Sequence, residues 1–413
     1  MCRRKGTSEL LSSSAHQGGG QEERFPLPTT IAIQPVTGPV TGSVCLPGSK
    51  SYTNRALPIA ALARGRSVIS GALFSDDTRY MARALRELGV AVHEDATGER
   101  FIVDGADGRI PAIQADLNLG LSGTAMRFLC AIVALGQGSY RLDGASRARQ
   151  RPIAPLLAAL TDLGVAARSE SGNGCPPVLV TTDGCPGGQA RMAGDISSQY
   201  FSGLLLAAPY MRDGLDLAVD GALVSRPYLD ITLGIMADFG VAVTRDGYER
   251  FQVAPGQRYQ ARDYRIEPDA SNATYFLAAA ALTGGNVRVE GLGRHSVQGD
   301  IQFLATLEAL GCTVRWGDEF LEVQGPSQLH GADLDLSDTN DTAQTVAALA
   351  PFCSSPVTLR GLAHTRHQET DRVAAVATEL RKLGATVEEH ADGWTIWPST
   401  LHAADVATYD DHR

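Results

Sequence analysis

Leu46-Pro-Gly-Ser-Lys-Ser-Tyr-Thr-Asn-Arg55 is a short polar stretch that opens directly onto the apolar run Ala56-Leu-Pro-Ile-Ala-Ala-Leu-Ala63. This change in polarity predicts a helix start, where unpaired backbone N–H groups and the helix dipole favour an anion. Lys50 and Arg55 add fixed positive charge at that end. The stretch is not a Walker A loop, because G-x-x-x-x-G-K-[ST] is not satisfied. Taken alone, the stretch fits a capped surface helix as well as an anion-binding helix start, so the rest of the chain is needed to choose between the two interpretations.

A glycine-containing helix ending recurs five times along the chain. The five copies are Leu88-Gly89-Val90, Leu163-Gly164-Val165, Phe239-Gly240-Val241, Leu310-Gly311-Cys312 and Leu383-Gly384-Ala385. A helix-start signal keeps nearly the same interval and falls at Ser51, Thr124, Ser198, Ser271, Asp341 and Asp411. Glycine just after a helix and Ser, Thr or Asp just before one are the expected end signals. The sequence therefore predicts repeats of about 70 residues.

Each repeat is predicted to hold two helices separated by short strands, which indicates the α/β class. The first helices, such as those containing 203–208 and 277–282, are strongly apolar and are expected to be buried. The second helices, such as 79–88, alternate charged and apolar residues and are expected to lie outside. Six starts are matched by only five endings, so we expect the chain to stop inside its sixth repeat, about 40 residues short of the last ending.

The composition is that of an ordinary globular protein of 413 residues, with 44% hydrophobic and 20% charged residues. A net charge of −10 argues against general binding of nucleic acids or membrane surfaces. The seven cysteines include no C-x-x-C pair, which predicts reduced, mostly buried thiols and no metal site. Residues 1–29 lack an apolar core of the kind found in secretory signals and are predicted to be a disordered or mis-started tail.

Positively charged residues gather near the predicted helix starts, where the helix dipole disfavours them. They are Lys50, Arg55, Arg127, Arg151, Arg372 and Arg413. Because equivalent helix ends share one face of a repeat fold, these cations would converge on a site for two phosphates or carboxylates. Asp341 and Glu369 would lie among them and are candidates for proton transfer. The alternative is that each Ser, Thr or Asp there is only an N-cap worth about 1 kcal/mol.

Eight short motifs, in order and suitably spaced, resemble the 3-phosphoshikimate 1-carboxyvinyltransferase (EPSP synthase) family of enolpyruvyl transferases. They are Gly48-Ser-Lys-Ser51 with Arg55, Ser122-Gly-Thr-Ala-Met-Arg127, Arg151-Pro-Ile153, Ser197-Ser-Gln199, Ser225-Arg-Pro-Tyr228, Asp269-Ala-Ser271, Glu369-Thr-Asp-Arg372 and Asp410-Asp-His-Arg413. The resemblance implies a two-domain inside-out α/β barrel built from six βαβαββ-type repeats, three per domain. The first domain would span 48–264, and the second would combine 30–47 with 265–413.

The resemblance also implies a reaction: transfer of the enolpyruvyl group of phosphoenolpyruvate to the 5-hydroxyl of shikimate 3-phosphate, without metal or organic cofactor, by a cytoplasmic monomer. Shikimate 3-phosphate would be held by Lys50, Ser51, Arg55, Ser197, Ser198, Gln199, Ser225, Tyr228, Asp341 and Gln368. Phosphoenolpyruvate would be held by Lys50, Gly123, Arg151, Gln199, Arg372 and Arg413. Lys50, Asp341 and Glu369 would carry the proton transfers.

The chain departs from the family pattern at three positions near these motifs. Leu121 stands where many members have Asn, Gln368 replaces a Lys that contacts shikimate phosphate, and His364 stands where Asn is common. The family's last segment, with another phosphoenolpyruvate-binding Lys, is also expected to be missing. These departures motivate an alternative, an impaired or non-catalytic anion-binding homologue. A UDP-N-acetylglucosamine enolpyruvyl transferase and a purely structural repeat protein are weaker alternatives, because neither accounts for the whole set of motifs.

Overall fold

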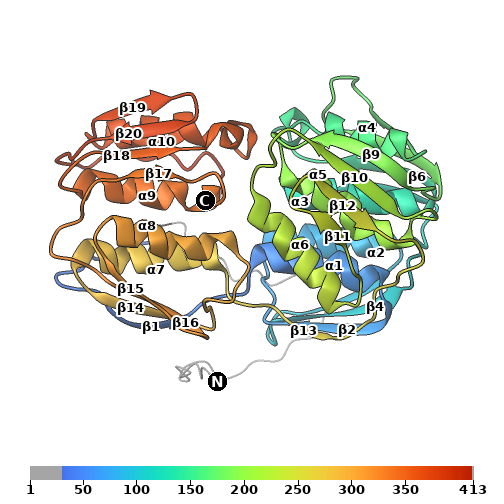
Figure 1. Cartoon of the computed structure of the whole chain (residues 1–413), viewed down its shortest axis with the longest axis horizontal. Helices are drawn as coiled ribbons and strands as arrows, with labels where there is room; N and C mark the ends of the chain where they lie inside the picture. The colour runs from blue at the N-terminus through green and yellow to red at the C-terminus, as the bar shows by residue number, and fades with distance from the viewer. Residues whose placement is uncertain (1–29, 412–413) are drawn as a thin grey trace, which may run out of the picture.

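The computed structural model describes residues 30–411, and these form two lobes joined by two chain crossings (Figure 1). The first lobe has its own hydrophobic core, which draws on residues 52–266. The second has a separate core drawn from residues 270–396. The tail predicted at 1–29 and the predicted ligand Arg413 lie outside the described residues.

Three four-stranded sheets belong to the first lobe. Their strands are β2 (Arg64–Ser70), β3 (Ala91–Asp95), β4 (Arg100–Ala106), β5 (Gln114–Asn118), β6 (Gln137–Asp143), β7 (Ala166–Ser169), β8 (Val178–Asp183), β9 (Gly188–Ala193), β10 (Leu215–Asp220), β11 (Thr244–Asp246), β12 (Arg250–Val253) and β13 (Asp263–Arg265). The sheet orders are β13-β2-β4-β3, β5-β6-β8-β7 and β11-β12-β10-β9.

Two further sheets belong to the second lobe. Their strands are β1 (Thr41–Cys45), β14 (Asn286–Glu290), β15 (Thr313–Trp316), β16 (Phe320–Gln324), β17 (Asp333–Asp335), β18 (Val357–Arg360), β19 (Val387–His390) and β20 (Gly393–Ile396). The orders are β1-β14-β16-β15 and β17-β18-β20-β19. In all five sheets a parallel pair is followed by two antiparallel pairings. The mixed α/β class predicted from the sequence is confirmed.

The helices alternate with the strands in both lobes. The α-helices are α1 (Lys50–Leu62), α2 (Asp76–Glu87), α3 (Gly123–Ile132), α4 (Ala154–Asp162), α5 (Ser198–Ala207), α6 (Arg226–Asp238), α7 (Ala270–Thr283), α8 (Phe303–Ala309), α9 (Ala343–Leu349) and α10 (Arg372–Lys382). The short 3₁₀ helices are η1 (Val133–Leu135), η2 (Ala148–Gln150), η3 (Ala208–Tyr210), η4 (Gly299–Gln302), η5 (Asn340–Thr342), η6 (Ala350–Phe352) and η7 (Ala363–His367). The longest α-helix in residues 30–411 has 14 residues, and none there is long and apolar enough to cross a bilayer.

Helices α1, α3 and α5 pack against one another in the first lobe and are almost entirely buried. This is the burial expected of the first helix in each predicted repeat. In the second lobe α7 packs against α9 and α8, and it leaves an apolar groove between α7 and α9. The expectation that 277–282 is wholly buried is therefore wrong for Leu282, which is 43% exposed at the edge of that groove. The residues of the groove are Tyr275, Ala278, Ala279, Leu282, Gln344, Thr345, Ala348 and Leu349.

Five helices end at glycines in the left-handed region of backbone space. Gly89, Gly164, Gly240, Gly311 and Gly384 follow α2, α4, α6, α8 and α10 with φ between +87° and +99°. Residues with a Cβ rarely adopt this conformation, whereas glycine adopts it freely. The helix endings predicted at these glycines are confirmed by their geometry.

The chain crosses between the lobes twice, and the two crossing segments pair with each other. Strand β1 adds to β14 of the second lobe, whereas β13 returns to pair with β2 of the first lobe. Ser49 N donates to Glu267 O at 2.8 Å, and Asp269 N donates to Pro47 O at 3.0 Å. A Cβ on Gly48 would overlap the carbonyl oxygen of Gly71, so the crossing requires glycine there. The two paired crossing segments lead directly into α1 of the first lobe and α7 of the second lobe.

The described cysteines are mostly buried thiols. Cys130, Cys185, Cys312 and Cys353 are buried free thiols, and the free thiol Cys175 is half-buried. Cys45 is instead disulfide-bonded, so the prediction that all seven cysteines are reduced is wrong. No cysteine spacing indicated this bond, since the chain has no C-x-x-C pair. Cys45 lies at the exposed end of the edge strand β1.

Candidate active site

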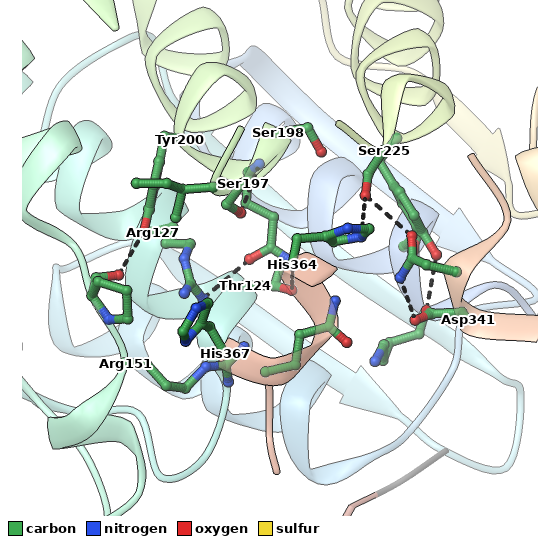
Figure 2. Close-up of a pocket in the computed structure, with 18 of the residues that line it drawn as sticks. Thr124, Arg127, Arg151, Ser197, Ser198, Tyr200, Ser225, Asp341, His364 and His367 are labelled. Atoms are coloured by element: carbon green, nitrogen blue, oxygen red, sulfur yellow. Dashed lines mark hydrogen bonds between the residues drawn. The ribbon is translucent and has the colours of Figure 1, made fainter. Parts of the chain in front are cut away.

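A cleft with a cavity volume of about 80 Å³ lies between the two lobes. The first lobe contributes Lys50, Ser51, Arg55, Thr124, Arg127, Arg151, Pro152, Ile196, Ser197, Ser198, Gln199, Tyr200, Ser225 and Tyr228. The second lobe contributes Asn340, Asp341, His364, His367 and Gln368 (Figure 2). Most of these side chains are polar or charged, which suits an ionic ligand.

Helix starts supply much of the cleft wall. Lys50 and Ser198 are the first residues of α1 and α5, and Ser225 precedes α6 as its N-cap. Thr124 is in the first turn of α3, and Asp341 is in η5, directly before α9. The first backbone N–H groups of a helix lack partners within it, and with the helix dipole they favour anions. The wall is therefore positive beyond the charges of its side chains.

Two buried arginines extend this positive wall. Arg55 donates through Nε to Thr232 Oγ1 at 2.7 Å and through one terminal nitrogen to the Ser51 carbonyl at 3.0 Å. Burial lowers the pKa of Arg55 to about 10. Burial and the neighbouring Arg127 lower the pKa of Arg151 to about 10, although Glu369 opposes the shift. Both guanidinium groups remain protonated at neutral pH, because both pKa values stay well above 7.

Gly123 sits where these cations come closest to the start of α3. A Cβ built on Gly123 would overlap the terminal nitrogens of both Arg127 and Arg151. The close approach of two guanidinium groups to a helix start forms a cradle that only glycine leaves open. Leu121, two residues earlier, contributes its carbonyl oxygen, which accepts from Arg151 at 3.3 Å. Its half-exposed side chain does not line the cleft.

Hydrogen bonds across the cleft join the start of α6 to η5 and η7. Ser225 Oγ donates to Asn340 Oδ1 at 3.1 Å and lies 3.3 Å from His364 Nε2. Ser225 has φ of +52°, an unfavourable conformation for a residue with a Cβ. Tyr228 donates its hydroxyl to Asp341 Oδ2 at 2.8 Å. Burial lowers the pKa of His364, so its imidazole is neutral at pH 7.

Arg372 is surrounded by three carboxylates at the back of the cleft. Its guanidinium nitrogens lie 2.9 Å from Asp341 Oδ1, 3.2 Å from Glu369 Oε2 and 2.9 Å from Asp411 Oδ2. Burial alone would lower the pKa of Arg372, but the three carboxylates outweigh it and raise the pKa above its usual value. The side chain is 4% exposed, so this cluster is a nearly dry charge network. It fixes the orientation of Asp341, which lines the cleft.

Glu369 links the two lobes through its side chain and backbone. Its Oε1 lies 3.2 Å from an Arg151 nitrogen, while its other oxygen faces Arg372. Arg147 donates to the carbonyl oxygens of Glu369 and Gln368, both at 3.0 Å. Two arginines of the first lobe therefore hold the segment at the start of α10. Gln368 lines the cleft, and its buried Oε1 has no hydrogen-bond partner among the described residues.

Most predicted site residues line the cleft, including Lys50, Ser51, Arg55, Arg151, Ser197, Ser198, Gln199, Ser225, Tyr228, Asp341 and Gln368. Gly123, Glu369 and Arg372 lie behind this wall, in contact with Arg151 or Asp341. Arg127, predicted among the converging cations but assigned to neither substrate, also lines the cleft. The substrate assignments omitted the other lining residues, namely Thr124, Pro152, Ile196, Tyr200, Asn340, His364 and His367. Thr124 and Arg127 belong to the same motif as Gly123, and residues four apart share one helix face.

No group of three or more His, Cys, Asp or Glu side chains in residues 30–411 is arranged to hold a metal ion. The carboxylates at the back of the cleft face arginine, which neutralises the charge that would attract a cation. The described part of the cleft therefore has the donor set of an anion site.

Comparison with known proteins points to one family. Residues 35–413 match the model of EPSP synthase (3-phosphoshikimate 1-carboxyvinyltransferase). The chain is 48% identical to a 3-phosphoshikimate 1-carboxyvinyltransferase of Nostoc punctiforme over 93% of this chain and 90% of that protein. It is 44% identical to one from Shewanella baltica with the same coverage.

Solved structures show a similar fold. An EPSP synthase from Acinetobacter baumannii superposes with a TM-score of 0.72 at 24% identity, covering 88% of this chain and 83% of that one. The enolpyruvyl transferase NikO from Streptomyces tendae gives a TM-score of 0.68 at 18% identity over 89% and 84% of the two chains.

Proposed function

The chain belongs to the EPSP synthase (3-phosphoshikimate 1-carboxyvinyltransferase) family, and on that premise we propose which residues of the cleft carry out the reaction. The enzyme transfers the enolpyruvyl group of phosphoenolpyruvate to the 5-hydroxyl of shikimate 3-phosphate and releases phosphate, a step of aromatic amino acid biosynthesis. Both substrates are anionic. The observation that carries the assignment is the convergence of buried cations and helix starts on one cleft shared by two lobes.

Shikimate 3-phosphate would occupy the side of the cleft formed by α1, α5, α6 and η5. Its proposed ligands are Lys50, Ser51, Arg55, Ser197, Ser198, Gln199, Ser225, Tyr228, Asp341 and Gln368. The paired hydroxyls of Ser197 and Ser198 at the start of α5 suit a phosphate. Asp341, oriented by Tyr228 and Arg372, would accept the proton of the 5-hydroxyl as its oxygen attacks.

Phosphoenolpyruvate would occupy the side formed by α3 and the start of α10. Its proposed ligands are Lys50, Gly123, Arg151, Gln199, Arg372 and Arg413. In the addition step, C2 of phosphoenolpyruvate bonds to the shikimate oxygen while C3 gains a proton. In the elimination step, C3 loses a proton and the C2–phosphate oxygen bond breaks. Lys50 and Glu369 are proposed to manage these proton transfers, while the fixed cations stabilise the negative charge.

Glu369 can transfer protons to or from the substrate only after its ion pairs with arginine are broken. Its carboxylate pairs with Arg151 of the first lobe and with Arg372 of its own lobe. A substrate phosphate or carboxylate that takes over those two guanidinium groups would release the carboxylate toward the reacting carbons. Binding of phosphoenolpyruvate would thereby prepare its own acid–base group.

The test of the function is release of phosphate from phosphoenolpyruvate by the purified chain, with shikimate 3-phosphate supplied. We expect release that depends on both substrates, and no release when UDP-N-acetylglucosamine replaces shikimate 3-phosphate. Absence of turnover at saturating substrate, combined with calorimetric binding of shikimate 3-phosphate, would instead support the non-catalytic anion-binding alternative. That alternative is favoured by Gln368, which brings no charge to the cleft.

Gly123→Ala is expected to raise the KM for phosphoenolpyruvate about 10-fold or more, because the added methyl group displaces Arg127 and Arg151 from the start of α3. The KM for shikimate 3-phosphate should change much less. Steady-state kinetics with each substrate varied in turn measures both values. Gly234→Ala is the matched control, since a Cβ there meets no atom within 4 Å. Equal changes in both KM values would contradict the placement of Gly123.

The finer architecture is part of this proposal. We assign the chain to a two-domain inside-out α/β barrel of six repeats, with 48–264 in one domain and 30–47 plus 265–413 in the other. The common strand order of the five sheets and the two separate cores support this division, although the first core extends to Ile266, two residues past the proposed boundary. We also propose a cytoplasmic monomer, because one chain supplies both walls of the cleft. Elution as a dimer in size-exclusion chromatography would contradict the monomer.

A further inference from the structure

Arg127 is a buried cation that faces the cleft from α3. Its side chain lies beside Arg151 and the start of the helix (Figure 2). The residue is 6% exposed. Among the described residues, no carboxylate lies within ion-pair distance of its guanidinium group. A buried charge without an opposite charge is costly, because neither water nor a partner compensates its lost hydration.

The remaining contacts of Arg127 leave part of its hydrogen-bonding capacity unused. One terminal nitrogen donates to Gln199 Oε1 at 3.3 Å, and the guanidinium lies 5.5 Å from the centre of the Tyr200 ring. Its Nε is buried and has no acceptor among the described residues. The Nε of Arg151, directly beside it, is in the same state. Two adjacent guanidinium groups therefore each keep an unused donor, and their terminal nitrogens lie together at the start of α3.

The other buried arginines of the site differ in this respect. Arg55 donates to Thr232 and to the Ser51 carbonyl, and Arg372 faces three carboxylates. Arg151 has Glu369. Arg127 thus combines full burial with the weakest electrostatic compensation of these four, which is the state expected of a residue whose partner is a bound anion.

We propose that Arg127 binds the phosphate group of phosphoenolpyruvate together with Arg151 and the first N–H groups of α3. It would also position Gln199: its bond to Gln199 Oε1 directs Gln199 Nε2 toward Thr124 Oγ1, 3.4 Å away, on the same wall. The phosphate rather than the carboxylate is assigned here because a tetrahedral dianion can accept from two arginines and helix N–H groups together. This inference rests on the proposed function for the identity of the ligand.

The experiment compares Arg127→Met and Arg127→Lys with the wild-type chain, using inorganic phosphate as the probe. For Arg127→Met we expect the KM for phosphoenolpyruvate and the inhibition constant for inorganic phosphate to rise together, by roughly 10- to 100-fold. Arg127→Lys keeps the charge and should recover part of both. The KM for shikimate 3-phosphate should stay near the wild-type value. Arg191→Met is the control, because Arg191 is exposed and pairs with Asp220.

Thermal unfolding without ligand separates a binding role from a structural one. Met keeps the apolar stem and removes repulsion from Arg151, so the ligand-free midpoint of Arg127→Met should equal or exceed that of the wild type. A lower midpoint with an unchanged inhibition constant for phosphate would overturn the inference. An unchanged inhibition constant would overturn it in any case. An inactive wild-type chain would refute the proposed function. The role of Arg127 would still be tested in that case, because calorimetry can compare phosphate binding by Arg127→Met and by the wild type without turnover.

Discussion

Lys50→Ala is expected to lower kcat/KM by about 10²- to 10³-fold, the loss typical when one fixed charge is removed from a developing anion. Lys50 opens α1 and faces the cleft, where the proposed roles place it between both substrates. The free energy of unfolding should change by less than about 1 kcal/mol. Its described ion pair with Asp77 is long, at 3.9 Å, and alanine suits a helix start that disfavours a cation.

The measurement pairs steady-state kinetics with urea unfolding of the same preparation. Lys382→Ala provides the matched control, since Lys382 is a half-exposed lysine near the far end of α10 and pairs with Glu379. That control should keep wild-type kinetics. A large loss of stability in Lys50→Ala, with activity falling only in proportion to the unfolded fraction, would show that Lys50 is structural.

Arg372→Met is expected to reduce both stability and activity. It removes a cation that contacts Asp341, Glu369 and Asp411 together. Leaving buried carboxylates without that partner should lower the free energy of unfolding by about 3–5 kcal/mol. The kcat/KM of the folded fraction should fall by about 10³-fold, because Asp341 loses its orientation and the site loses a cation that is proposed to bind phosphoenolpyruvate. Urea unfolding measures the loss of stability, and steady-state kinetics without urea measures the loss of activity.

The pH dependence identifies the cause of that instability. In the wild type, Asp341, Glu369 and Asp411 raise the pKa of Arg372 and share its charge. Without Arg372 these carboxylates stay buried and lose that charge, so the folded variant gains stability when they are protonated. The folded variant would then bind more protons than the unfolded chain, so its deficit relative to wild type should shrink as the pH falls from 7.5 to about 5. A deficit that stays constant over this range would indicate lost packing instead. Arg381→Met, on the exposed face of the same helix, should be nearly neutral.

Local signals in the sequence were sufficient for the α/β class and for much of the cleft. Gly89 and its four counterparts are predictable because a left-handed helix ending depends on the residue itself. Ser198 and Lys50 are predictable because polar residues before an apolar run indicate a helix start. Arg127 was predicted among the converging cations, and its four-residue spacing from Gly123 also places both on one helix face.

Features set by distant partners could not be predicted in the same way. Glu369 faces Arg151, 218 residues earlier in the chain, and this pairing depends on how the lobes meet. The same holds for Arg147, whose side chain holds the backbone of Gln368 and Glu369. Leu282 is apolar like its neighbours, yet its exposure depends on which helices pack beside α7. The hydrophobic pattern of one helix does not show where a second helix will pack against it.

The pairing of β1 with β14 means that, during synthesis on the ribosome, β1 is made long before its partner strand. Thr41 pairs with Asn286, so the first strand must wait while the 245 residues that separate it from its partner are synthesised. At about 5–20 residues per second this delay is roughly 12–50 s. During that time β1 is an unpaired edge with free N–H and C=O groups, open to mispairing. The first lobe likewise cannot complete its β13-β2-β4-β3 sheet until residue 265 has emerged. The strand order therefore leaves the first strand of each of these two sheets incompletely paired until a distant part of the chain has been made.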